Sequence, residues 1–367
     1  MIPLVDLAWQ TAEIADDVRE GFDAVIASNA FILGPQVGDF ETEFAAFMGV
    51  SHCIGVGSGT DALELGLRAM GIGEGDEVIV PANTFIASAL AVVRAGAKPV
   101  LVDVDSTHSL IDPEAVRASL TDRTRAIMPV HLYGQMAPMG ALEALAGEQN
   151  LQIIEDAAQS QGATQGGRSA GSIGAVSATS FYPGKNIGAF GDAGAVLTDD
   201  EAVAEAVGRL RNWGSDVKYH HPEVGFNTRL DTLQAVVLAA KLGRLAGWNQ
   251  LRRDAAARYE ALLAGCEGAV LPQAAPTNEH VWHLYTVRVA ERDRVLSAMN
   301  EAGIGAGIHY PVPIHLQGAF SSMGLGAGSF PEAERSANEV LSLPLFPGIT
   351  EEQQARVAEA LRRALAS

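Results

Sequence analysis

Residues 76–82 read DEVIVPA and residues 98–105 read KPVLVDVD, and residues 85–97 between them have helical character. The alternation continues through further apolar runs that we interpret as strands: 125–133, 151–158, 177–183 and 194–200. Short runs rich in Val and Ile that alternate with helices are typical of a mainly parallel sheet covered by helices on both faces. The sequence therefore predicts an α/β fold.

The second part of the chain has a different pattern. Residues 232–263 predict one long helix, which at about 1.5 Å per residue could cross from one domain to the next. Residues 283–291 read as a strand, and Thr350 with Gln353 forms a capping box that opens a final helix. A length of 367 residues predicts about two domains. We expect a large α/β domain with an N-terminal helix and a smaller α+β domain, over 1–240 and 241–367.

The N-terminal segment predicts an amphipathic helix over residues 9–28. Its apolar residues recur at helical spacing: Ile14, Val18, Phe22 and Ile26. We expect this side to pack on another element.

The charge of the chain restricts its partners. Acidic side chains number 44 and basic side chains 25, a formal net charge of −19, which argues against general affinity for nucleic acid or anionic membrane surfaces.

Cys53 and Cys266 form no CxxC pair, so neither a disulfide framework nor a thiolate metal site is expected. Because no signal-peptide pattern and no apolar run of about 18 residues is present, we expect a cytoplasmic protein.

Small residues begin a helix at residues 56–70, which read VGSGTDALELGLRAM. Exposed N–H groups and the positive end of the helix dipole favour a phosphate there, and the hydroxyls of Ser58 and Thr60 could add donors. A plain capped helix start is the alternative. The stretch matches neither GxxxxGK[ST] nor GxGxxG, so a nucleotide P-loop and a dinucleotide fingerprint lack support.

Two further positions follow predicted strands, where ligands of parallel sheets bind. Glu155 and Asp156 end an apolar run, and metal ligation, acid–base catalysis, pairing with a protonated heterocycle and helix capping are all open for them. Lys185 follows Pro183-Gly184 in a turn, where partial desolvation would lower its pKa and make it a nucleophile. A solvated surface lysine is the alternative. A phosphate cradle, a carboxylate and a turn lysine together are what pyridoxal phosphate requires.

Motifs along essentially the whole chain carry a family resemblance: PLVDL, FILGPQVGDFETEFAAFMG, SGTDALELGL, EVIVPANTFIASALAV, PVHLYGQ, IIEDAAQ, SFYPGKN, GFNTRLDTLQAVVL and GIHYPVPIHLQ. The chain resembles the DegT/DnrJ/EryC1/StrS family of sugar aminotransferases. The resemblance implies a pyridoxal-phosphate enzyme of fold type I, with a mainly parallel sheet of seven-stranded type, that forms homodimers with shared active sites.

The resemblance also implies roles for individual residues. Lys185 resembles the lysine that forms the internal aldimine and moves a proton, and Asp156 resembles the partner of the pyridinium nitrogen. Gln159 resembles the residue that binds the ring hydroxyl, and Phe85 the aromatic residue stacked on the ring. The remaining cofactor positions match phosphate ligands, the last of them reaching the neighbouring subunit: Gly59, Thr60, Ser180 and Asn227.

The implied reaction moves an amino group from L-glutamate to a nucleotide-linked keto-sugar by way of pyridoxamine phosphate. SFYPGKN and HYPVPIHLQ resemble the branch that acts at C3 of dTDP- or UDP-3-keto-hexoses. The substrate candidates are Tyr182, His309, Tyr310, His315 and, from the partner, Arg229. Packing is an equal alternative for the tyrosines, and no third ligand accompanies the two histidines, so no metal is expected. Gln161 and Ala193 depart from the common His and Gly of the family.

Three alternatives are open at this point. The chain could aminate 4-keto sugars, or a cyclitol or another ketone without a nucleotide. A cofactor-binding regulator without catalysis is the third.

Overall fold

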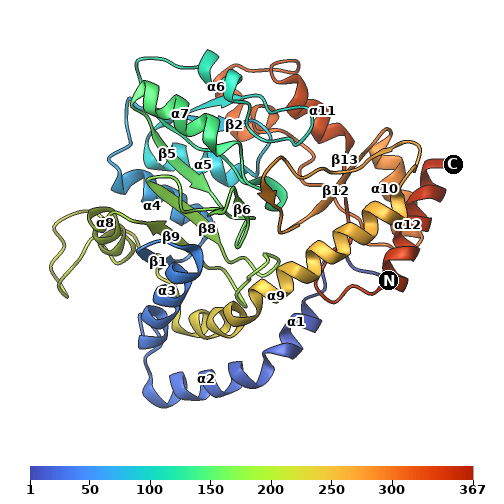
Figure 1. Cartoon of the computed structure of the whole chain (residues 1–367). Coiled ribbons are helices and arrows are strands. Elements are labelled where there is room, and N and C mark those ends of the chain that lie inside the picture. Colours follow the sequence, from blue (N-terminus) through green and yellow to red (C-terminus); the bar gives the residue numbers. More distant parts are fainter. Residues whose placement is uncertain (367) are drawn as a thin grey trace.

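The predicted strands of the first half lie in one sheet in the computed structural model, which describes residues 1–366 (Figure 1). The seven strands have the order β1-β9-β8-β5-β4-β2-β3. Their bounds are β1 His52–Val56, β2 Glu77–Pro81, β3 Lys98–Val102, β4 Thr124–Ile127, β5 Gln152–Asp156, β8 Val176–Ser180 and β9 Gly194–Thr198. Strand β9 runs antiparallel to β1 and β8, and the pairs among β3, β2, β4, β5 and β8 are parallel. The α/β fold class is therefore confirmed.

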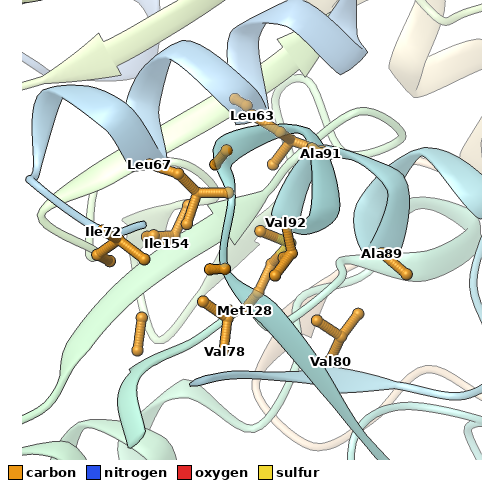
Figure 2. Close-up of a cluster of buried hydrophobic side chains, with 14 of the residues drawn as sticks. Leu63, Leu67, Ile72, Val78, Val80, Ala89, Ala91, Val92, Met128 and Ile154 are labelled. Atoms are coloured by element: carbon orange, nitrogen blue, oxygen red, sulfur yellow. The ribbon is translucent and has the colours of Figure 1, made fainter. Parts of the chain in front are cut away.

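Helices cover both faces of this sheet. One face carries α4 Gly59–Ala69, α5 Ile86–Ala95 and α8 Glu201–Arg211, and the other carries α3 Pro35–Met48, α6 Pro113–Ala118 and α7 Met139–Gln149. Residues alternate between the faces, so Val78 packs with Leu67 and Val92 under α4 and α5 (Figure 2), whereas Ile79 packs with Leu142 of α7. Strands buried on both faces explain the continuous apolar runs of the sequence.

The long helix α9 spans Thr232–Leu263, as the sequence predicts, and runs from α2 and α3 to the C-terminal helix (Figure 1). A second, antiparallel sheet lies beside its far end, with the order β10-β12-β13. The elements there are β10 Ala269–Val270, β12 Tyr285–Val289, α10 Arg292–Glu301, β13 Val340–Leu343 and α12 Glu351–Ala366. The capping box is confirmed, because Thr350 Oγ1 accepts from Gln353 N at 3.1 Å and Gln353 Oε1 accepts from Thr350 N at 2.9 Å.

Two sets of contacts join the halves of the chain. In a small sheet, β11 Asn278–Glu279 pairs with β6 Thr164–Gln165, which pairs on its other side with β7 Arg168–Ser169. Ile314, Phe320 and Ala333 pack in the same apolar cluster as α4 and α5. They belong to η2 Ile314–Leu316, η3 Gly318–Met323 and α11 Pro331–Glu339. The division at residues 240 and 241 stays a prediction.

The N-terminal segment differs from its prediction. It forms two helices, α1 Leu7–Glu13 and α2 Ala15–Ser28, because the backbone at Ile14 leaves the helical region (φ −118°, ψ 2°). Ile14 and Val18 are buried against Val237 and Trp248 of α9. The expected Ile26 is 58% exposed and Val25 is buried instead, so the predicted stripe is wrong at its end.

Candidate active site

Lys185 lies in a turn directly after β8. Its N–H donates to the carbonyl of Tyr182 at 2.8 Å, and the turn closes so tightly that a Cβ on Gly188 would lie 2.4 Å from the Pro183 carbonyl oxygen. Burial lowers the pKa of Lys185 to about 8, although the negative charge of Asp156 opposes the shift. A substantial fraction of the amine is therefore neutral in mildly alkaline solution, which is the condition for a nucleophilic lysine.

Asp156 is the last residue of β5 and is 5% exposed. Its Oδ2 accepts from the hydroxyl of Ser88 at 2.7 Å, and its Oδ1 accepts from Ala158 N at 3.2 Å. The Ser88 hydroxyl lies 2.9 Å from that of Thr84, one helical turn earlier. These contacts hold the carboxylate in one orientation at the carboxyl end of the sheet.

A connected set of side chains surrounds this edge of the sheet. Gln159 accepts from Tyr133 N at 2.7 Å through Oε1 and donates to the Tyr310 hydroxyl at 3.1 Å through Nε2. The rings of Phe85 and Tyr310 lie 5.3 Å apart, and the Tyr133 hydroxyl donates to the carbonyl of His309 at 2.5 Å. The contacts bring together predicted residues from three separate stretches of the chain, and Tyr133, which was not predicted, from a fourth.

His309 and Tyr310 share the charge environment of the catalytic candidates. Burial, assisted by the charge of Lys185, lowers the pKa of His309 to about 4, and its Nδ1 lies 2.8 Å from Ser342 Oγ. Burial also raises the pKa of Tyr310 above its ordinary value, and the charge of Asp156 adds to this. At neutral pH both side chains are therefore uncharged beside Lys185 and Asp156.

Residues 57–60, which span the start of α4 and which we call the phosphate turn, lie beside the end of β8. Ser58 caps α4 by accepting from Asp61 N at 3.1 Å, and the first N–H groups of the helix have no acceptor within it. A Cβ on Gly59 would lie 2.7 Å from Cβ of Ser180, so glycine is required for this approach. Thr60 is the second residue of the helix. The three predicted phosphate positions of one chain therefore adjoin one another.

Asn227 and Arg229 face away from this turn. Between them, Thr228 accepts from Gly57 N at 3.0 Å and donates to Asp61 Oδ2 at 2.7 Å, whereas Arg229 donates to Asn227 and Asn212. The guanidinium also lies 5.8 Å from the centre of the Trp213 ring. Because alternate residues of an extended segment point to opposite sides, Thr228 faces its own helix α4 and its two neighbours do not.

The other substrate candidates occupy different surroundings. Tyr182 is 60% exposed. His315 is buried, with Nε2 2.9 Å from Glu334 Oε1 and its ring against Phe330, and its described contacts include none with Lys185 or Asp156. Gln161, a departure from the family pattern, donates to Thr179 Oγ1 at 2.7 Å and to the Ser180 carbonyl at 3.0 Å beneath the phosphate turn. The roles of these residues stay predictions.

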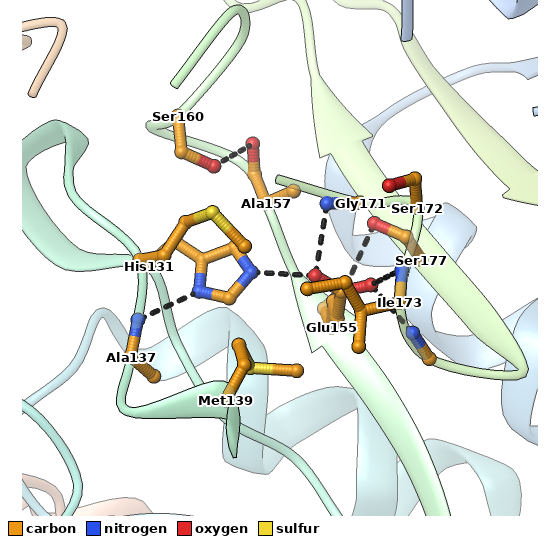
Figure 3. Close-up of polar contacts among 12 residues, drawn as sticks. His131, Ala137, Met139, Glu155, Ala157, Ser160, Gly171, Ser172, Ile173 and Ser177 are labelled. Carbon is orange, nitrogen blue, oxygen red and sulfur yellow. Dashed lines mark hydrogen bonds and ion pairs between the residues drawn. The ribbon is translucent and has the colours of Figure 1, made fainter. Parts of the chain in front are cut away.

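Glu155 and Asp156 have opposite surroundings. Glu155 is fully buried and accepts from His131 Nε2 at 2.7 Å and from the N–H groups of Gly171, Ile173 and Gly174 at 2.7 to 2.8 Å (Figure 3). These donors lower its pKa against the opposing effect of burial. Since every acceptor position is engaged, Glu155 is a structural carboxylate, and Asp156 is the one at the site.

Sequence reasoning missed Ser88, Asn186 and His283. The signal for Ser88 is its position four residues after Thr84, as the one hydroxyl in a helix that is otherwise apolar up to Arg94. Asn186 and His283 lie 3.1 Å apart (Asn186 Oδ1 to His283 Nδ1), although 97 residues separate them. No local pattern reveals a contact over that separation.

Comparison with known proteins identifies the family. Residues 12–362 match the model of the DegT/DnrJ/EryC1/StrS aminotransferase family. The chain belongs to this family.

Among residues 1–366, no three His, Cys, Asp or Glu side chains are grouped as a metal site requires, and no helix has the length and apolar character that a membrane span needs.

Three similar proteins give further detail. A dTDP-3-amino-3,4,6-trideoxy-alpha-D-glucose transaminase of Streptomyces venezuelae is 47% identical, and the match covers 98% of this chain and 95% of that protein. A protein named pleiotropic regulatory protein, of Geobacillus stearothermophilus, is 44% identical over 98% of this chain and 97% of its own. The crystal structure of S. venezuelae DesV in complex with a ketimine intermediate has a TM-score of 0.97 at 47% identity, covering 100% of this chain and 99% of that one.

The family and its structures establish the chain as a pyridoxal-phosphate-dependent transaminase. The residues present fit this cofactor. Lys185 offers an amine of lowered pKa and Asp156 a buried carboxylate for a protonated ring nitrogen. The N-terminus of α4, closed by Gly59 against Ser180, offers N–H donors for a phosphate. The sequence prediction of the cofactor is therefore confirmed.

Proposed function

We propose that the chain transfers the amino group of L-glutamate to C3 of a dTDP- or UDP-linked 3-keto-hexose. The observation that carries the proposal is the cluster of Lys185, Asp156 and Gln159 beside the uncharged His309 and Tyr310. The name of the 47% identical relative, a dTDP-3-amino-sugar transaminase, supports the sugar and the carbon. We also propose that the enzyme acts in the cytoplasm.

Each residue of the cluster has a role in this proposal. Pyridoxal phosphate supplies an electron-withdrawing heterocycle and an aldehyde carbon that exchanges amines. Nζ of Lys185 would hold the cofactor at that carbon and, as a free amine, would move the proton at the substrate carbon. Asp156 would hold the ring nitrogen and keep it protonated, Gln159 would hold the ring hydroxyl, and Phe85 would contact the face of the ring. Gly59, Thr60 and Ser180 bind the phosphate.

We further propose a homodimer in which the site is completed by the partner subunit. Asn227 would reach the phosphate and Arg229 the diphosphate of the substrate. Their orientation away from their own helix α4 and the exposure of Asn227 support this, as does the 49% exposure of Trp213 beneath Arg229. A cation positioned at the site, such as Arg229, explains how a chain of net charge −19 binds an anionic substrate.

The test is glutamate-dependent turnover with matched keto-sugars. We expect turnover of a dTDP- or UDP-3-keto-hexose, formation of 2-oxoglutarate in equal amount, and at least about tenfold lower kcat/KM with the 4-keto isomer. Preference for the 4-keto isomer, or equal turnover of a cyclitol ketone without a nucleotide, would overturn the proposal.

Regulation without catalysis is a second candidate, favoured by the name of the 44% identical pleiotropic regulatory protein. This chain nevertheless has both Lys185 and Asp156, and the charge of Asp156 acts on the lysine amine. Cofactor binding without amine exchange with glutamate, measured by the visible spectrum, would favour the regulator.

A further inference from the structure

The loop that follows Lys185 has no regular secondary structure, yet helix α9 holds it at three points. Gln234 Oε1 accepts from Phe190 N at 2.8 Å, Lys241 Nζ donates to the Gly188 carbonyl at 2.5 Å, and Asn249 Oδ1 accepts from Asn186 Nδ2 at 2.9 Å. The three helix residues are seven and eight positions apart, about two turns each, so they lie on one side of α9. This side of the helix therefore faces the lysine loop.

Asn186, the residue next to Lys185, has further partners outside α9. Its Nδ2 also donates to the Val281 carbonyl at 3.0 Å, and its Oδ1 lies 3.1 Å from His283 Nδ1. The amide is 1% exposed, and both its N–H groups and its oxygen are engaged. The orientation of the amide is fixed by this network, because its nitrogen faces two acceptors.

The network also fixes the state of His283. An amide oxygen accepts and does not donate, so Nδ1 of His283 carries the proton of a neutral ring. Burial first, and then the charge of Lys185, lowers the pKa of His283 well below its ordinary value. The imidazole of His283 is therefore neutral and adds no second positive charge near Lys185.

We propose that Asn186 is a positioning residue for Lys185: its amide ties the lysine turn to Asn249 of α9 and to the segment 281–283, and so sets the direction of the amine. The proposal rests on the assignment of Lys185 as the catalytic lysine. Adjacent residues share one backbone, so a rotation at position 186 moves Lys185 directly. A displacement of about 1 Å at the reacting group can cost about 100-fold in rate.

The test compares Asn186→Ala with Asn278→Ala in the cofactor-loaded enzyme. Asn278 is the control, because both ends of its amide are hydrogen-bonded as well, to N and O of Met136, away from the lysine turn. For Asn186→Ala we expect the visible absorption band of the cofactor bound to Lys185 to persist. The midpoint of the pH titration of this band should move by at least about half a unit. We expect kcat to fall about 10- to 100-fold, with KM for the keto-sugar within about twofold of the wild type.

For Asn278→Ala we expect some loss of thermal stability with an unchanged titration midpoint and kcat. Equal loss of stability in both variants with the wild-type midpoint and kcat in Asn186→Ala would overturn the proposal. If Asn186→Ala does not fold, Asn249→Ala decides in its place, since it removes one partner and leaves Asn186 present. A smaller shift of the midpoint would then support the proposal, and an unchanged midpoint would overturn it. Loss of the band in Lys185→Ala tests the catalytic lysine separately.

Discussion

The hydroxyl of Ser88 donates a 2.7 Å hydrogen bond to Oδ2 of Asp156 in a fully buried setting. Ser88 lies on α5, one turn after Phe85, whereas Asp156 ends β5. Helix α5, whose N-cap Phe85 is predicted to stack on the cofactor ring, therefore also orients the carboxylate predicted to pair with the ring nitrogen. Two contacts to one flat ligand are thus set by the position of a single helix.

Replacing Ser88 by Ala is expected to lower kcat about tenfold, because a hydrogen bond to a charged group contributes about 1.5–3 kcal/mol. The carboxylate loses the donor that orients it, although the lysine and the phosphate turn are untouched. Steady-state kinetics with glutamate measure the effect.

The control is Ser177→Ala, since Ser177 is equally buried and donates to the Glu155 carbonyl at 3.3 Å, one residue from Asp156. That variant is expected to keep kcat within about twofold, because it loses one neutral hydrogen bond of about 1 kcal/mol. Equal losses of kcat in both variants would mean that Ser88 acts through general packing.

The pKa of Lys185, lowered to about 8, makes capture of the cofactor dependent on pH. The neutral amine is the reactive form, and its fraction rises about tenfold per pH unit below the pKa and levels off above it. The capture rate of cofactor-free protein, followed by visible absorbance, should therefore rise to about pH 8 and then become constant. A rate that still rises tenfold per unit between pH 9 and 10 would show an ordinary lysine.

Asp156→Asn provides the matching control for that profile. Its negative charge raises the pKa of Lys185 against the effect of burial, so its removal should shift the inflection of the capture rate to lower pH. The direction is informative because loss of a merely structural contact would not move the inflection.

A shared site predicts complementation between inactive subunits. Lys185→Ala and Asn227→Ala homodimers should each have low activity, and a mixed dimer contains one site that carries neither substitution. After mixing and subunit exchange, about one quarter of wild-type activity is the upper limit expected for random pairing of equal amounts. Sedimentation of the mixture measures the fraction of the protein that is dimeric. Absence of any recovery despite proven exchange would contradict the role of Asn227 in the partner's site.

The sequence predicted six of the seven strands of the main sheet and the long helix, because buried strands and a 32-residue helix leave strong local patterns, but it did not predict β1. It also singled out Asp156 and Lys185, since the first ends a strand and the second lies in the turn after one. What it could not predict are contacts made across the fold. Ile14, where the N-terminal helix breaks, packs against α9, and the partners of Asn186 come from α9 and from a segment about 95 residues later.

The pair Glu155 and His131 gives a prediction about stability. Glu155 accepts four hydrogen bonds while fully buried (Figure 3). Because His131 Nδ1 accepts from Ala137 N at 3.1 Å, Nε2 of His131 carries the ring hydrogen and donates it in a hydrogen bond to Glu155. Glu155→Gln turns an N–H group toward other N–H donors. We expect a loss of about 3 kcal/mol or more in the free energy of unfolding.

The same substitution should change how stability depends on pH. The folded pKa of Glu155 is lowered, so its contribution is complete above the ordinary value of 4.5 and is lost as pH falls through the folded pKa. Urea unfolding between pH 3 and 7 should therefore show a weaker loss of stability at low pH in Glu155→Gln than in the wild type. Glu143→Gln, which removes an exposed partner of Arg168, is the control and should cost about 1 kcal/mol or less. If the two variants lose the same stability, the buried carboxylate does not hold the turns around β5 together.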